Sequence, residues 1–263
     1  MNPNMNQESS LERHFEIAET TVDDLMRIVN SINTRGKKAK KASQTGSVRD
    51  FIIAVTELRS LVEDLGSAVD DLSTLAEVDV SEMMESGSYK EELFSLCEKE
   101  DIRIIESDGK FLSYPTIFSL SPSDASVIIE KKKQRGIRPS FLVSQLKGLA
   151  KRQFGLKPET FIEMLATAYD LVVAEKQLQP GTVVKLMDLF RVLTILPAAK
   201  IYTKSEFARD IYLLDQSGVD TTRGGRILKL PASAMTRSSG TMETVAKGGQ
   251  IKLYAGISFE VVQ

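Results

Sequence analysis

Residues 51–76 read FIIAVTELRSLVEDLGSAVDDLSTLA, and their apolar side chains recur at alternating intervals of four and three residues. The repeating positions are Phe51, Val55, Leu58, Val62, Leu65, Val69, Leu72 and Ala76. Such spacing places one narrow stripe along one side of an α-helix, which is the heptad pattern of a coiled coil. The stretch therefore predicts a long helix that packs against another helix.

A second stretch with the same period precedes it. Ser9 is a candidate N-cap with Glu12 three residues later, and the apolar positions are then Leu11, Phe15, Ala18, Val22, Leu25, Val29 and Ile32. Between the two stretches, residues 33–47 (NTRGKKAKKASQTGS) contain no large apolar side chain and predict a flexible basic loop. Residues 9–78 thus predict an antiparallel coiled-coil hairpin. Because a narrow stripe buries little surface, we expect the hairpin to pair with a second copy or with another protein.

The flanking segments predict the remaining organisation. Residues 1–8 are polar and predict disorder, and the acidic residues 79–88 predict a linker. Residues 89–263 predict a mixed α+β domain, which begins with a small antiparallel meander that turns at Asp108-Gly109. Strand-like alternation near the C-terminus predicts a β-hairpin. The expected fold class is α+β, mostly α.

The composition excludes several classes of protein. The chain has 263 residues with a single cysteine, Cys97, and a single histidine, His14. It therefore has no internal disulfide and lacks the four Cys or His ligands of a structural zinc site, so we expect no metal and no cofactor. No apolar run reaches the roughly 20 residues that span a bilayer, and the first residues lack the features of a secretory signal. We expect a cytoplasmic protein without a membrane partner.

A net charge of −2 conceals strong segregation of charge along the sequence. Residues 34–49 contain six basic residues and no acid, whereas residues 57–108 contain sixteen acids against four basic residues. Residues 131–157 contain nine Lys or Arg and no acid. Such asymmetry indicates separate surfaces for separate partners.

The basic segment 131–157 predicts a contact with the phosphate backbone of nucleic acid, with DNA favoured over RNA. The candidate phosphate-binding residues are Lys131, Lys132, Lys133, Arg135, Arg138, Lys147, Lys151 and Arg152. Contacts with about six phosphates would give a log–log salt dependence with a slope near −5 on duplex DNA. The alternatives are that the segment binds an acidic protein surface, pairs with the acidic residues 57–108, or is simply solvated.

One arrangement of residues raises the possibility of catalysis. Asp108 at a turn, followed by Glu130 and Lys132 near the end of a later strand, is a constellation also used by metal-dependent nucleases. Asp-Gly turns and Glu-Lys runs are also common for structural reasons. We therefore expect a non-enzymatic accessory subunit of a nucleic-acid-handling complex that oligomerises or binds a partner through its coiled coil. The alternatives are an interaction adaptor without nucleic acid and a metal-dependent nuclease.

Overall fold

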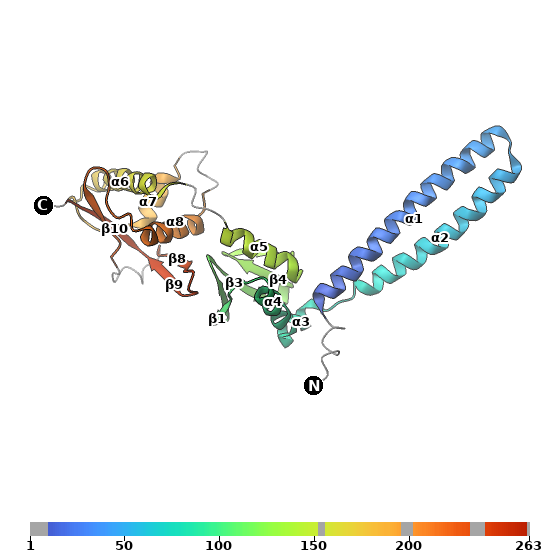
Figure 1. Ribbon diagram of the computed structural model, residues 1–263, viewed down its shortest axis with the longest axis horizontal. Coiled ribbons are helices and arrows are strands. Elements are labelled where there is room, and N and C mark those ends of the chain that lie inside the picture. Colours follow the sequence, from blue (N-terminus) through green and yellow to red (C-terminus); the bar gives the residue numbers. More distant parts are fainter. Residues whose placement is uncertain (1–9, 152–155, 196–201, 232–239, 262–263) are drawn as a thin grey trace. The chain divides into compact units, whose positions relative to one another are not determined.

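The computed structural model describes residues 10–151, 156–195, 202–231 and 240–261 (Figure 1). Helices predominate, the sheets are small and antiparallel, and the first two helices pack as a hairpin, so the predicted fold class is confirmed. The chain divides into two compact units. The first comprises Met1–Leu93, Pro122–Ala125 and Arg138–Ser140, and the second comprises the residues between and after them. Residues 1–8, for which disorder was predicted, lie outside the described part of the chain.

Two long antiparallel helices, α1 (Leu11–Thr45) and α2 (Val48–Leu75), form the hairpin of the first unit (Figure 1). Ser9 lies outside the described residues, and the side chain of Ser10 caps α1 by accepting a hydrogen bond from the Arg13 amide. Gly46 ends α1 in the left-handed conformation with φ of 69°. The flexible loop predicted for residues 33–47 is therefore wrong, because α1 continues to Thr45. Lys, Arg, Ala and Gln are strong helix formers, so the segment needs no large apolar side chain to stay helical.

Each helix is rotated about its own axis relative to the prediction, so that a different stripe of residues faces the partner helix. Its buried and half-buried positions are Leu11, His14, Ala18, Thr21, Leu25, Ile28, Ile32, Arg35, Ala39 and Ala42 in α1, and Ala54, Leu58, Leu61, Leu65, Ala68, Leu72 and Leu75 in α2. These positions also alternate by three and four. They share Leu25, Leu58 and other predicted seam residues, but Val22, Val29, Val55, Val62 and Val69 are exposed and Phe15 is half-buried. The apolar stripe of each helix is three positions wide, and the partner helix covers two of them.

Two short helices follow, α3 (Val80–Ser86) and α4 (Ser88–Lys99). The predicted linker 79–88 is therefore wrong over most of its length. The Asp79 side chain accepts a hydrogen bond from the Glu82 amide and caps α3, and Gly87 ends it with φ of 88°. Acidic residues near the start of a helix are stabilising, so the composition that suggested a linker is compatible with a capped helix.

A five-stranded antiparallel meander begins the second unit. Its strands are β1 (Ile105–Ser107), β2 (Lys110–Ser113), β3 (Thr116–Ser121), β4 (Ser126–Ile129) and β5 (Lys132–Gln134), and they pair in sequence order. A 3-10 helix, η1 (Pro122–Asp124), connects β3 to β4. Two-residue turns with positive φ at both residues, the type I′ pattern, lie at Asp108-Gly109 and at Glu130-Lys131. The first turn was predicted, whereas β5 and its turn were not.

Helix α5 (Pro139–Lys151) follows the meander, and its buried side chains are not part of the main core. The remaining elements pack around that core. They are α6 (Pro158–Glu175), β6 (Val184–Lys185), α7 (Leu186–Leu193), α8 (Lys204–Ser217), β7 (Arg226–Lys229), β8 (Met242–Val245), β9 (Ile251–Tyr254) and β10 (Gly256–Val261). The strands pair in the order β6-β10-β7, and β8 pairs with β9 in a hairpin near the C-terminus. Phe161, Leu165, Leu189, Phe207 and Ile257 are fully buried in this core.

Hydrogen bonds connect the C-terminal hairpin to the meander. The Thr244 hydroxyl donates to the Pro115 carbonyl at 3.0 Å, and the Val245 amide donates to the same carbonyl at 3.3 Å. Pro115 lies in the turn between β2 and β3 at the same end of the sheet as the Glu130-Lys131 turn. This end of the meander is therefore fixed against β8. No helix in the described ranges has the length and apolarity needed to cross a membrane.

Candidate nucleic-acid interface

Four lysines from separate elements line one cavity of about 350 Å³ in the second unit. Lys131 belongs to the β4–β5 turn, Lys132 begins β5, Lys110 begins β2 and Lys204 begins α8. Thr116, Thr203, Ser205 and the carboxylates Glu130 and Glu243 also line it. We call this the lysine cavity. The hydrogen-bonded contact between β8 and the meander places these elements around it.

The positive charges of this cavity are not neutralised by ion pairs. Among the described residues, Lys110, Lys131, Lys132 and Lys204 form no salt bridge with a carboxylate. Burial lowers the pKa of Lys204, and the nearby charge of Lys131 lowers it further, while the Glu243 carboxylate acts in the opposite direction. Two ammonium groups that repel each other in a partly buried site favour the binding of an anion.

The start of α8 adds hydrogen-bond donors to the same cavity. Thr203 and Glu206 form a capping box, in which the Glu206 amide donates to the Thr203 hydroxyl at 3.2 Å. Lys204 and Ser205 occupy the first two helical positions, where backbone amides and the helix dipole favour negative charge. Because both residues line the lysine cavity, the end of the helix contributes to its positive potential.

The Thr116 hydroxyl is buried in the wall of the lysine cavity. The residue is 2% exposed, and its hydroxyl has no hydrogen-bond partner among the described atoms. Most buried polar groups in proteins are hydrogen-bonded. Because the hydroxyl oxygen itself is inaccessible, an anion in the cavity would reach it only if the wall rearranged.

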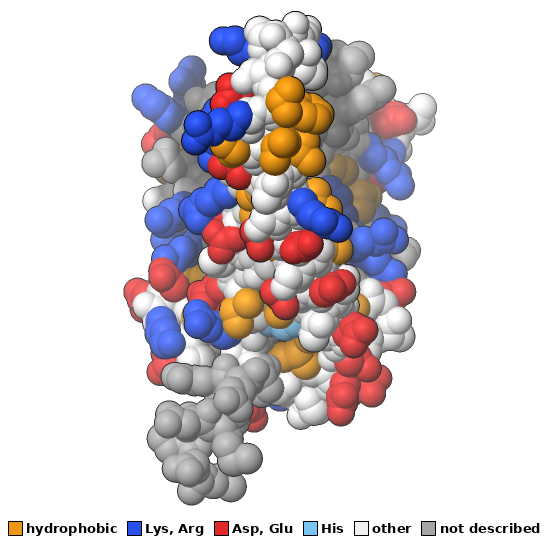
Figure 2. Space-filling model, turned by 90° about the vertical axis from the view of Figure 1, so that its right-hand side faces the viewer, with side chains coloured by type: hydrophobic (Ala, Val, Ile, Leu, Met, Phe, Trp, Pro, Cys, Tyr) orange, Lys and Arg blue, Asp and Glu red, His pale blue; other side chains and the backbone are white. Residues whose placement is uncertain are grey.

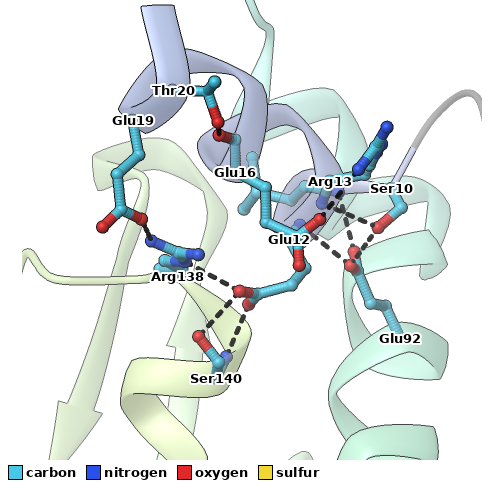
Figure 3. Close-up of polar contacts among 10 residues, drawn as sticks. Ser10, Glu12, Arg13, Glu16, Glu19, Thr20, Glu92, Arg138 and Ser140 are labelled. Carbon is cyan, nitrogen blue, oxygen red and sulfur yellow. Dashed lines mark hydrogen bonds and ion pairs between the residues drawn. The ribbon is translucent and has the colours of Figure 1, made fainter. Parts of the chain in front are cut away.

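Arg138 from the predicted set is engaged by carboxylates instead (Figure 3). Its guanidinium donates to Glu12 at 2.7 Å and to Glu19 at 2.7 Å, and these bonds, that to Glu19 first, raise the pKa of Arg138. Burial works against ionisation of Glu12, but hydrogen bonds from the Ser140 amide and hydroxyl and from Arg138 outweigh it and lower the pKa of Glu12. Arg138 therefore anchors the start of α5 to α1.

Glu92 completes the polar cluster in Figure 3. Its carboxylate accepts hydrogen bonds from the Ser10 hydroxyl at 2.5 Å and from the Leu11 and Glu12 amides at 2.9 Å. A carboxylate at the first amides of a helix is a favourable cap. The base of the hairpin is thus held by a residue that lies about eighty positions further along the chain, which no local sequence pattern indicates.

The other predicted phosphate-binding residues are dispersed. Lys147 forms an ion pair with Glu100, and Lys133 points to the face of β5 opposite Lys132. Arg135 and Lys151 are exposed but do not line the lysine cavity, and Arg152 lies outside the described residues. The structure thus brings Lys131 and Lys132 together with Lys110 and Lys204, which sequence reasoning missed. Lys204 directly follows Thr203, the N-cap of α8, and a position after a helix cap is a weak local signal.

The residues of the nuclease hypothesis do not form one site. Glu130 and Lys132 are neighbours at one end of the meander, but the Asp108 turn lies at the opposite end and three strands away. Within the described ranges, no three His, Cys, Asp or Glu side chains cluster as metal ligands would. Cys97 is buried, and burial raises the pKa of its thiol to about 11, which disfavours a nucleophilic thiolate. His14 belongs to the hairpin seam and donates to the Leu75 carbonyl.

Comparisons with protein-family models, with curated proteins and with solved structures gave no match to this chain.

Proposed function

We propose that the protein is a non-enzymatic accessory subunit of a nucleic-acid-handling complex and that it binds backbone phosphates in the lysine cavity. The observation that carries this proposal is the convergence of Lys110, Lys131, Lys132 and Lys204 on one cavity, where burial and the charge of Lys131 lower the pKa of Lys204. The first amides of α8 support it, because they can hydrogen-bond to phosphate oxygens.

The proposed contact recognises phosphate rather than base sequence. Lysines and helix amides bind backbone oxygens, which fix the register of a protein on nucleic acid but carry no sequence information. DNA is the first polymer to test. The hairpin formed by α1 and α2 would associate with a second copy or with another protein and so join the phosphate-binding unit to the rest of a complex.

The test is binding of labelled duplex DNA, single-stranded DNA and RNA, measured by fluorescence anisotropy over a salt series. The Lys131→Gln/Lys204→Gln variant removes two charges from the lysine cavity. On duplex DNA we expect its log–log salt slope to be smaller than that of the wild type by about 1.8, together with weaker binding at every salt concentration.

A matched variant changes two lysines outside the cavity. Lys185 and Lys252 are exposed residues of the same unit, so Lys185→Gln/Lys252→Gln alters the net charge equally. We expect its salt slope to stay close to that of the wild type. Equal loss in both variants would mean that binding depends on overall charge alone and would refute the proposed site. Absence of binding at low salt would favour the adaptor alternative, in which the lysines bind an acidic protein surface.

A further inference from the structure

The hairpin has an apolar face in addition to its seam. With Leu25 and Leu58 at heptad position a, and Ile28 and Leu61 at position d, position e is apolar over residues 15–29 of α1 and over residues 48–69 of α2. Its apolar members are Phe15, Val22 and Val29 in α1, and Val48, Val55, Val62 and Val69 in α2, while Gly36 and Ser43 occupy it near the turn. The valines are between 39% exposed at Val29 and 70% exposed at Val48. We call this surface the e face.

Both sets of e positions lie on the same side of the hairpin. In an antiparallel pair of helices, e positions flank e positions on one side of the seam, and g positions flank g positions on the other. The g positions are Ile17, Asp24, Ser31 and Lys38 in α1, and Asp50, Glu57, Asp64 and Asp71 in α2. One side of the hairpin is therefore apolar, and the opposite side is mostly charged or polar.

Three apolar positions in seven are more than a two-helix coiled coil needs. A pair of helices uses positions a and d, whereas a helix of a four-helix bundle uses a, d and either e or g. Gly66 and Ser73 lie next to the e positions on α2, and these small residues permit a close approach. The pattern is that of half of a four-helix bundle whose other half is absent from a single chain.

The charges along the hairpin indicate which partner completes the bundle. Residues 34–49, around the turn, contain six basic residues and no acid. Residues 11–24 and 63–77, toward the other end, contain ten acids and one Arg. Figure 2 shows this gradient, with acidic side chains in the lower half and basic side chains beside hydrophobic ones at the upper end. A second hairpin in antiparallel orientation places each basic end against an acidic end, whereas a parallel one brings the two basic ends together.

We propose that two copies of this chain associate by packing the e faces of their hairpins against each other in antiparallel orientation, which forms a four-helix bundle. This inference deepens the assembly part of the proposed function and rests on it, since it names the partner of the hairpin. Twofold symmetry then places α2 over α2 of the second copy and brings the two Val62 side chains together near the middle of the bundle.

The first test is the mass in solution, measured by light scattering without nucleic acid. The Val29→Glu/Val62→Glu variant introduces charge into the middle of the e face, and Asn30→Glu/Ser60→Glu introduces the same charge on exposed positions outside it. The wild type and the Asn30→Glu/Ser60→Glu control have twice the chain mass of 29.1 kDa, and the e-face variant has the mass of one chain with unchanged helical circular dichroism. A monomeric wild type at about 100 µM, or a dimeric e-face variant, refutes the proposal.

The second test determines the orientation by oxidative disulfide formation between introduced cysteines. Val62→Cys cross-links two copies, because position 62 meets itself. Val48→Cys does not, because an antiparallel arrangement separates the two positions by about 42 Å, twice the rise over fourteen helical residues. Cys97 is buried and does not compete. Cross-linking of Val48→Cys without that of Val62→Cys refutes the antiparallel orientation.

Anisotropy measurements on the e-face variant separate this inference from phosphate binding. If the wild type binds nucleic acid but is monomeric, only the assembly inference is refuted. If it dimerises through the e face but binds no nucleic acid, only the proposed phosphate contact is refuted.

Discussion

The Lys204 ammonium group makes the proposed binding depend on pH. Its pKa lies below the ordinary lysine value of 10.5 because of burial and the charge of Lys131. Below this lowered pKa the cavity carries its full positive charge, and that charge decreases as the pH rises through it. We expect nucleic-acid affinity to fall at a lower pH than the titration of exposed lysines, and Lys204→Arg to remove this early fall. Anisotropy between pH 7 and 10.5 checks this expectation, and identical pH profiles for the two proteins would contradict it.

The same lysine affects stability in the opposite sense to its effect on binding. Between the lowered folded pKa and the unfolded pKa, the unfolded chain binds more protons, so stability rises with pH in this window. Below the folded pKa, Lys204 is protonated in both states, and the destabilisation caused by its burial and by the charge of Lys131 is fully present. A bound anion relieves it, so phosphate should stabilise the protein more at pH 7 than above pH 10.

Asp210 belongs to a buried polar group on α8. Its carboxylate accepts a hydrogen bond from the Tyr202 hydroxyl at 2.6 Å and pairs with Arg209 at 3.4 Å. Arg209 is 5% exposed and Asp210 is 6% exposed, and burial raises the pKa of Asp210. Asp210→Ala should lower the free energy of unfolding by about 1–3 kcal/mol, because the buried Arg209 and the Tyr202 hydroxyl each lose a hydrogen-bond partner. Urea denaturation measures this change.

A surface ion pair offers the matched control. Asp170, whose side chain is 53% exposed, pairs with Arg226 at 2.6 Å. Asp170→Ala should cost less than about 1 kcal/mol, because exposed ion pairs contribute little. An equal loss of unfolding free energy in Asp210→Ala and Asp170→Ala would show that the Asp210–Arg209 pair is solvated.

At the scale of single residues, sequence reasoning found part of the candidate site. The charge run included Lys131 and Lys132, two of the four lysines that line the cavity, because their signal is local. Lys110 and Lys204 are isolated in the sequence and reach the cavity only through tertiary packing. The ion pairs of Arg138 with Glu12 and Glu19 could not be predicted from local sequence either, since both carboxylates lie more than a hundred residues away.

Among the elements, the β4–β5 turn combines strain with the proposed binding role. Glu130 and Lys131 adopt φ of 50° and 68°, although the type I′ turn favours Asn-Gly. Glu130→Asn/Lys131→Gly should raise the free energy of unfolding by about 1 kcal/mol through relief of strain. The same variant should weaken nucleic-acid binding, because Lys131 is lost. Urea denaturation and anisotropy on one preparation test both effects.

The β1–β2 turn provides the comparison for this variant. It has the same conformation but already contains Asp108-Gly109, so Asp108→Asn should change stability and binding little. Unchanged stability of Glu130→Asn/Lys131→Gly would show that the β4–β5 turn is not strained.

The helical hairpin shows what periodicity predicts and where it fails. The heptad spacing correctly predicted two long antiparallel helices. It selected the most apolar stripe as the seam, but the helices instead bury a stripe that includes His14, Thr21 and Arg35 and leave Val22 and Val29 exposed. A three-position stripe allows two rotations, and only the packing of both helices together distinguishes them. The basic end was predicted as a loop because helix propensity was given less weight than the absence of large apolar residues.

At the scale of the whole molecule, the segregation of charge was visible in the sequence, but its consequences depend on the fold. Residues 34–49 extend the hairpin instead of forming a separate loop. Part of the basic segment 131–157 lines the lysine cavity, and part of it is paired with acids. The distribution of charge along the sequence therefore predicted charged surfaces. It did not identify which of the charged side chains are paired within the chain and which are left to bind a partner.

The separation of the seam from the e face has a further consequence for regulation by concentration. Because the seam alone holds α1 against α2, each chain can fold before it assembles, and the degree of assembly follows the amount of protein present. Two linked lysine cavities on one polymer would then bind with an avidity that can exceed the affinity of either by about 10²–10⁴. Scarce protein would dissociate from nucleic acid readily, and abundant protein would stay bound.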